Sequence, residues 1–211
     1  MNKRIYNAIA GRNRERLAAL SDGVFAFAMT VLVLDIRPPA LETVHSEADL
    51  WRAIVALAPR LVAFLMSFMT LGIFWVGQQT QHDAVDHTDR SYTWLHIGFL
   101  MAVCLMPFST ALLAEFITFR AALFVYWLNI LLLGLLLLAA WYRAKWFGLV
   151  GPDAVQDIDD AFVRRVLVAQ ALYAAGTALS LIGPTWWSIA MIFAVQLLYV
   201  IAPRVWPLNR L

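Results

Sequence analysis

The sequence predicts an all-α membrane protein with six transmembrane helices. Of its 211 residues, 62% are hydrophobic and 14% are charged, whereas soluble domains carry about 25% charged residues. Six apolar segments each approach the ~20 residues needed to cross the hydrocarbon core of a bilayer. They span residues 17–36, 60–80, 92–114, 120–142, 162–182 and 185–203. We expect residues 1–211 to form one six-helix transmembrane domain in the lipid bilayer.

The distribution of basic residues predicts that both termini are cytoplasmic. One side of the six segments holds twelve Lys and Arg residues: Lys3, Arg4, Arg12, Arg14, Arg16, Arg90, Arg143, Lys145, Arg164, Arg165, Arg204 and Arg210. The other side holds four: Arg37, Arg52, Arg60 and Arg120. Cytoplasmic loops carry the excess of Lys and Arg, so the first side is predicted to be inside. We expect a multi-pass protein of the plasma or inner membrane.

The first segment, residues 17–36, contains Ser21 and Asp22 within an otherwise apolar helix. An ionised Asp at the centre of a membrane helix costs about 2.5–3.5 kcal/mol on insertion scales, so such residues usually face protein or water. Asp22 therefore marks a polar site, which needs hydrogen-bond donors from neighbouring helices.

Helical periodicity divides this segment into two faces. At about 100° per residue, Phe27, Val31 and Leu34 fall on one line, with Thr30 on its flank. Asp22 lies about 140° from Phe27, on the side that also holds Phe25, Met29 and Leu32. We predict that the first line is an uncovered apolar stripe and that the Asp22 side packs against the other helices.

Depth in the membrane suggests the partners of Asp22. With the amino terminus inside, Ser21 and Asp22 lie about one and a half turns into the membrane. Donors at similar depth are Trp75, Gln78 and Gln79 on the second segment and His96 on the third. We expect them to form a structural polar network with Ser21 and Asp22. Arg16 lies on another face, and we expect it to reach a neighbouring helix or a lipid phosphate.

Three further features predict local structure. Ser46 to Asp49 reads as a capping box that starts a short amphipathic helix at the outer surface. Pro107 should kink the third helix, with the freed carbonyl met by Ser109, Thr110 or a neighbour. Asn129, in the most apolar segment, should form a hydrogen bond between helices.

Several functions are excluded or disfavoured by what the sequence lacks. No glycine-rich phosphate loop, zinc-ligand spacing or basic stripe is present, which argues against nucleotide-driven pumping and nucleic-acid binding. The acidic and histidine residues from His82 to Ser91 are interpreted as a solvated loop rather than a metal site. No nucleophile, base and metal ligands share one depth, so we expect no enzyme activity. The single cysteine, Cys104, allows no intramolecular disulfide.

Arg16 and the run from Ser21 to Leu34 resemble the Arg-x-x-x-Phe-Ser-Asp signature of the transmembrane protein 175 family of lysosomal and bacterial potassium channels. Gly72 to Trp75 and Pro107 to Glu115 are also similar to that family. The chain departs from the signature at Leu20, where the family has Phe, and at Phe27, where the family usually has Ile or Leu.

The resemblance implies a bacterial single-repeat member: a potassium-permeable channel that conducts monovalent cations and assembles as a homotetramer around a pore lined by the first helix. In the family, large aliphatic residues of that helix form a hydrophobic constriction in place of a carbonyl selectivity filter. The corresponding positions here are Phe27, Val31 and Leu34, with Thr30 implicated in selectivity. No cofactor is expected besides the permeant K⁺.

Asp22 leaves a second function open. Carboxylates inside membranes commonly relay protons, so a proton-leak pathway or a proton-coupled secondary transporter using Asp22 is the alternative hypothesis. No internal repeat of the kind found in many transporters is visible in the sequence.

Overall fold

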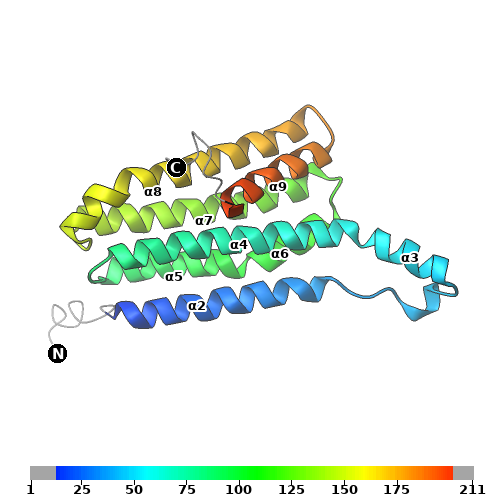
Figure 1. The fold of residues 1–211 in the computed structure, drawn as a ribbon, viewed down its shortest axis with the longest axis horizontal. Coiled ribbons are helices and arrows are strands. Elements are labelled where there is room, and N and C mark those ends of the chain that lie inside the picture. The colour runs from blue at the N-terminus through cyan, green and yellow to red at the C-terminus, as the bar shows by residue number, and fades with distance from the viewer. Residues whose placement is uncertain (1–12, 202–211) are drawn as a thin grey trace.

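The computed structural model describes residues 13–201, without the side chains of residues 152–159, as a bundle of long helices (Figure 1). The described elements are α2 (Arg14–Val31), η1 (Leu32–Asp35), η2 (Leu41–Thr43), α3 (Glu47–Ala56), α4 (Ala58–Ala84), α5 (Arg90–Cys104), α6 (Met106–Glu115), α7 (Arg120–Trp146), α8 (Pro152–Ala178), η3 (Leu179–Leu181) and α9 (Thr185–Ile201). Lys3, Arg4, Arg12, Arg204, Arg210 and the last two residues of the predicted sixth span lie outside the described residues.

Within the described part of the chain, four helical stretches are long and apolar enough to cross a membrane. They are Arg14–Asp35, Ala58–Ala84, Arg90–Glu115 and Arg120–Trp146. Helix α9 is apolar but shorter, at 17 residues, and the 27-residue α8 is not among the four. The protein is therefore an all-helical, multi-pass membrane protein.

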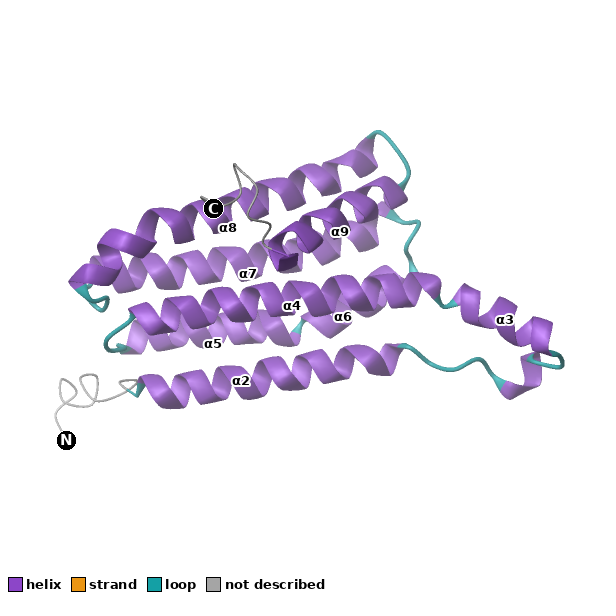
Figure 2. Ribbon diagram, in the orientation of Figure 1, coloured by secondary structure: helices purple, strands orange, loops and turns teal. Residues whose placement is uncertain are grey.

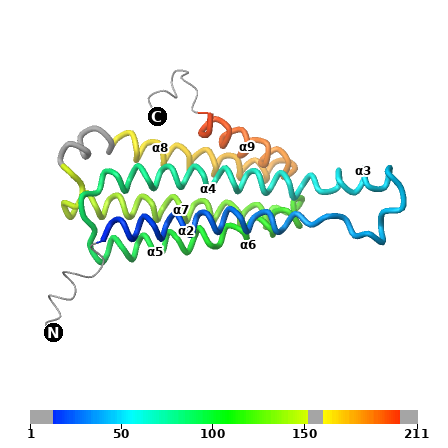
Figure 3. The backbone as a smooth tube through the Cα atoms, turned by 60° about the horizontal axis from the view of Figure 1, so that its bottom comes forward, coloured from blue at the N-terminus to red at the C-terminus, as the bar shows by residue number. Residues whose placement is uncertain are grey.

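The helices are arranged so that α2 lies at one side of the bundle and α8 and α9 lie at the other (Figures 1 and 3). Helix α2 packs on α4 and α5, while α7 packs on α5, α6 and α8. In an apolar window of 18 residues within Arg14–Asp35, 28% of the residues are buried, compared with 50% in the corresponding window of α7. The first helix is thus the least enclosed of the four membrane-length stretches.

The start of α2, the loop between α4 and α5 and the loop between α7 and α8 lie at the same end of the bundle (Figure 1). The two loops are joined by an antiparallel bridge between Val85 and Val150 and by the Asp86 N–H, which donates to Leu149 O at 2.9 Å. Gly148 in the second loop has φ of 65°, a left-handed conformation that favours glycine. This pairing holds together the end of α4, the end of α7 and the start of α8.

The third predicted segment is interrupted, as Pro107 indicated, and Figure 2 shows the break between α5 and α6. At the break, Ala102 O and Met106 N do not bond each other as a continuous helix would require. In the amide orientation that satisfies its neighbours, Asn129 of α7 donates to Ala102 O at 3.0 Å and accepts from Met106 N at 3.2 Å. The predicted bond between helices is present, and it repairs the interrupted helix.

The predicted capping box also forms. The Ser46 hydroxyl oxygen accepts from Asp49 N at 3.2 Å and begins α3. Helix α3 and the segment before it extend beyond the end of the bundle (Figures 1 and 2). Trp51 and Val55 of α3 are exposed, as expected for a helix whose apolar side lies at a membrane surface.

Candidate functional site: the α2 face and its polar network

The apolar stripe of α2 is uncovered in the isolated chain. Phe27 and Leu34 are 70% and 69% exposed, Thr30 is exposed and Val31 is half-buried. On the opposite face, Phe25 is 1% exposed, and Ala28 and Leu32 are equally enclosed. The predicted division of the first helix into two faces is therefore confirmed. The helix is shorter than expected, because it ends at Val31 and continues as the tighter η1.

Ser21 is fully buried behind the stripe and joins α2 to α5. Its hydroxyl lies 2.8 Å from His96 Nε2 and donates to Leu17 O at 2.9 Å. His82 Nε2 and Gln78 Nε2, both from α4, approach the same His96 nitrogen at 3.3 and 3.4 Å. A neutral imidazole nitrogen either donates or accepts. One nitrogen atom thus couples α2, α4 and α5.

His82 was missed as a member of this cluster, because the sequence interpretation placed it in a solvated loop. Helix α4 instead continues to Ala84, and His82 is 5% exposed with its ring 4.6 Å from the His96 ring. The available signal was the four-residue spacing of Gln78 and His82, which places both on one helical face. Polar residues at the end of α4 lowered its hydropathy and concealed the continuation.

Asp22 is paired as expected with Trp75, whose Nε1 donates to Asp22 Oδ1 at 2.9 Å. The prediction that the Asp22 side packs against the other helices does not hold for Asp22 itself, which is exposed. His96 of the third predicted span serves Ser21 rather than Asp22. The Asp22 carboxylate therefore accepts the Trp75 indole N–H while the residue remains exposed.

The outer members of the predicted network do not join it. Gln79 is exposed on α4, and Arg16 is exposed on α2, where its backbone N–H donates to Asn13 Oδ1 at 2.9 Å. The arginine that reaches a neighbouring helix is Arg14 rather than Arg16. Its Nη1 donates to Val85 O at 2.8 Å and to His82 O at 3.3 Å. Two residues along a helix correspond to about 200°, which is why Arg14 faces α4 and Arg16 does not.

A second buried network lies toward the middle of the bundle. Thr110 donates to Ser67 at 2.6 Å, and Gln196 Nε2 donates to Thr70 at 2.7 Å. The fully buried Tyr126 hydroxyl lies 3.3 Å from Ser67 and 3.4 Å from Thr70. These contacts join α4, α6, α7 and α9 away from α2. We assign them to holding the helices together, as polar side chains between membrane helices generally do.

Asp89, in the loop between α4 and α5, forms an ion pair with Arg143 in the last turn of α7. Asp89 also accepts from the Tyr92 N–H at 2.7 Å and caps α5. Burial by itself raises the pKa of the Asp89 carboxyl, but the hydrogen bonds from Arg143 and Tyr92 outweigh it, and the pKa lies below the ordinary value of 3.8. Among the described residues, no group of three or more His, Cys, Asp or Glu side chains is arranged to hold a metal ion.

The site is therefore an apolar face left uncovered on one helix of a multi-pass membrane protein, backed by a polar network that joins this helix to α4 and α5. Comparison with known proteins specifies the class further. The family description "Endosomal/lysosomal potassium channel TMEM175" matches residues 16–107.

Bacterial relatives of this chain are named potassium channels. The one from Chamaesiphon minutus is 32% identical over 88% of this chain and 93% of its own length. The one from Streptomyces collinus is 36% identical over 61% of this chain, and the match spans 63% of that relative. The human endosomal/lysosomal proton channel TMEM175 is 23% identical over 93% of this chain and 40% of its own length.

The fold agrees with a solved member. The crystal structure of a lysosomal potassium-selective channel TMEM175 homologue from Chamaesiphon minutus superposes with a TM-score of 0.75 at 30% identity, covering 89% of this chain and 96% of that one. The chain belongs to the TMEM175 family. It is a cation channel of the membrane and not an enzyme.

Proposed function

We propose that this chain is the subunit of a potassium-permeable channel whose pore is lined by the α2 stripe. The observation that carries the proposal is the uncovered line of Phe27, Val31 and Leu34 on the least enclosed membrane helix. A single stripe cannot surround a path. Rotational symmetry repeats it around an axis, and four copies agree with the tetramer implied by the sequence resemblance.

The chemistry of the stripe favours a hydrophobic constriction. Three apolar rings offer neither charge nor carbonyl oxygen to replace the hydration shell of an ion, so a narrow ring resists ions by dewetting. Thr30 lies beside them, and its hydroxyl donates to Phe27 O at 2.8 Å. The hydrogen of that hydroxyl is occupied, which leaves the lone pairs of the oxygen for a cation. Selectivity for K⁺ over Na⁺ should be modest, because K⁺ gives up water at lower cost.

The proposed topology has six spans in one unit of residues 1–211, with α8 and α9 as the fifth and sixth. The end of the bundle that holds Arg14, Arg16, Arg90, Arg143 and Lys145 faces the cytoplasm of a plasma or inner membrane, since basic residues gather on that side. The channel needs no cofactor besides the permeant ion.

A second function is favoured by the position of Asp22. The residue is exposed and follows the buried Ser21 in the chain. The Ser21 hydroxyl lies 2.8 Å from His96 Nε2, and His82 Nε2 lies 3.3 Å from the same nitrogen. Relatives from human and other vertebrates are named proton channels. A proton path or proton-coupled carrier that uses Asp22 is therefore the competing proposal.

Recording from the purified protein in planar bilayers distinguishes the two. Under opposed K⁺, Na⁺ and H⁺ gradients, the channel proposal predicts discrete openings and a reversal potential that follows the K⁺ gradient. A reversal potential that follows the H⁺ gradient supports the proton path. A saturable flux without openings supports a carrier and contradicts the channel.

A further inference from the structure

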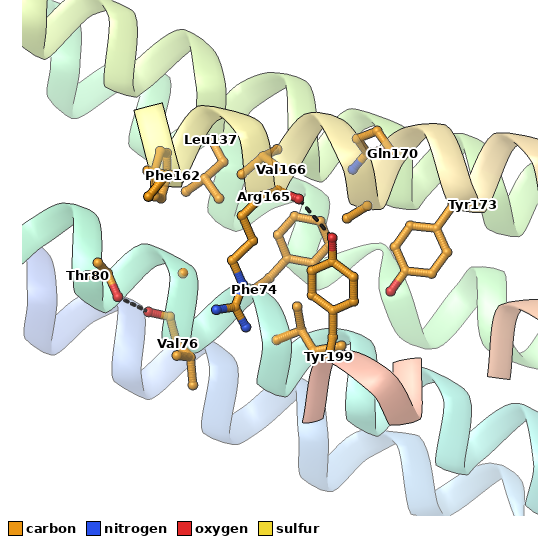
Figure 4. A pocket seen from close by; sticks show the side chains of 14 residues that line it. Phe74, Val76, Thr80, Leu137, Phe162, Arg165, Val166, Gln170, Tyr173 and Tyr199 are labelled. Carbon is orange, nitrogen blue, oxygen red and sulfur yellow. Dashed lines mark hydrogen bonds between the residues drawn. The ribbon is translucent and has the colours of Figure 1, made fainter. Parts of the chain in front are cut away.

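A groove on the side of the bundle away from α2 forms a cavity of about 190 Å³ (Figure 4). It lies between α4 and α8, with α7 at its base and Tyr199 of α9 beside it. Most of its walls are apolar and include Phe74, Val76, Gly77, Leu137, Phe162 and Val166. None of the described residues that line this groove comes from α2, so the groove is separate from the proposed pore.

One cation lies in this groove. The exposed Arg165 side chain extends from α8 toward α4, and its Cζ lies 5.4 Å from the centre of the Tyr199 ring (Figure 4). The Tyr199 hydroxyl donates to Arg165 O at 3.0 Å and so holds the ring beside the guanidinium. No ion pair joins Arg165 to an acidic side chain among those that the structure describes.

One wall of the groove reaches close to the end of the bundle that carries the basic residues. Thr80, in its wall, is four residues from the end of α4 at Ala84, or about 6 Å along the helix axis. An arginine near such a boundary can reach the headgroup layer while its stem stays on apolar surface. A guanidinium favours a phosphate because it presents several donors in a fixed plane.

We propose that the groove binds an anionic phospholipid, with one acyl chain along its apolar wall and the headgroup phosphate on Arg165. The apolar lining matches the acyl chain, and the guanidinium of Arg165, which has no ion-pair partner among the described side chains, matches the headgroup. The inference does not depend on which ion permeates, because the site lies away from α2.

The test is native mass spectrometry of the full-length protein titrated with phosphatidylglycerol or phosphatidylcholine. Wild type should retain phosphatidylglycerol more strongly than phosphatidylcholine. Arg165→Gln should weaken phosphatidylglycerol binding about fivefold, the scale of one arginine near an anionic surface. The matched control is Arg164→Gln, because Arg164 is exposed at the adjacent position and does not line the groove. Arg164→Gln should leave the preference unchanged.

A second variant tests the apolar wall. A Cβ added at Gly77 would meet only Leu137 Cδ2, at 3.7 Å, so Gly77→Leu can fill the groove without displacing the backbone. It should weaken binding of both lipids, and inorganic phosphate should not compete with phosphatidylglycerol in wild type. Equal retention of both lipids by wild type, or equal effects of the two arginine variants, would overturn the proposal. Loss of the oligomer in Arg165→Gln without loss of bound lipid would assign the groove to a second copy of the chain instead.

Discussion

At the scale of single residues, the contact between Asp22 and Trp75 connects α2 to α4. The carboxylate of the exposed Asp22 accepts one indole N–H. Depth in the membrane predicted Trp75 as one of four candidate donors for Ser21 and Asp22. It could not show which donors turn toward Ser21, because that depends on how α5 is rotated against α2.

Removing this contact should destabilise the folded subunit. Hydrogen bonds to charged groups contribute about 1.5–3 kcal/mol, and exposure of Asp22 places the expected loss toward the lower end. Asp22→Ala and Trp75→Phe should each lower the thermal midpoint in detergent, measured by fluorescence-detected size exclusion. The double variant should lose no more than the larger single loss.

Trp94→Phe is the matched control, because Trp94 is exposed on α5. It should leave the midpoint unchanged. Additive losses in the Asp22 and Trp75 double variant would show that the two side chains do not act on each other.

Asp89 predicts a pH dependence of stability. A carboxyl whose pKa is lower in the folded than in the unfolded chain stabilises the fold above the unfolded pKa, and this stability is lost as pH falls through the folded pKa. The thermal midpoint of wild type should therefore decline as pH falls below 3.8, the ordinary value of this carboxyl. Asp89→Asn should start lower at neutral pH and decline less.

Asp160→Asn provides the comparison, since Asp160 is an exposed carboxyl residue of α8. Its pH profile should follow that of wild type. A profile of Asp89→Asn that is parallel to wild type throughout would contradict the role given to the Asp89 and Arg143 pair.

At the scale of elements, the break between α5 and α6 shows where sequence reasoning ends. Pro107 predicted a kink, because proline lacks the N–H needed by a continuous helix. No pattern in the sequence connects Asn129 with Ala102 and Met106, which are more than 20 residues away. The repair arises only when α7 packs against the break, and tertiary packing of this kind has no local signature.

Asn129→Leu should leave Ala102 O and Met106 N buried without partners, at a cost of about 1–3 kcal/mol for each group. The expected result is a clearly lower thermal midpoint and a smaller yield of assembled protein. Leu128→Ala, at an exposed neighbouring position, should have little effect. An Asn129→Leu variant as stable as wild type would mean that the amide does not satisfy the interrupted helix.

At the scale of the whole molecule, the two-faced first helix was predictable, because a period of 3.6 residues sorts its side chains without tertiary information. The continuation of α4 through His82 could not be predicted, since the hydropathy of the sequence falls before the helix ends at Ala84. The role of Arg14 was also missed. Arg14 reaches the end of α4 because its side chain points to that helix, whereas Arg16, two residues later, points to nearly the opposite side of α2.

The uncovered stripe predicts a closed ring of subunits. Native mass spectrometry in mild detergent should detect tetramers, because each copy contributes one stripe to a common axis. Monomers alone, from preparations that conduct ions in bilayers, would contradict a pore formed between subunits.

The central claim is that Phe27 faces the ion path while Phe25 faces the protein core, and paired current recordings of Phe27→Ala and Phe25→Ala test it most directly. Phe25 is 1% exposed, and a buried Phe→Ala change costs about 3–5 kcal/mol, so Phe25→Ala should reduce assembly. Phe27→Ala should assemble normally, raise unitary conductance and reduce discrimination between K⁺ and Na⁺, because it widens an apolar ring. Altered permeation in Phe25→Ala together with unchanged permeation in Phe27→Ala would contradict the account.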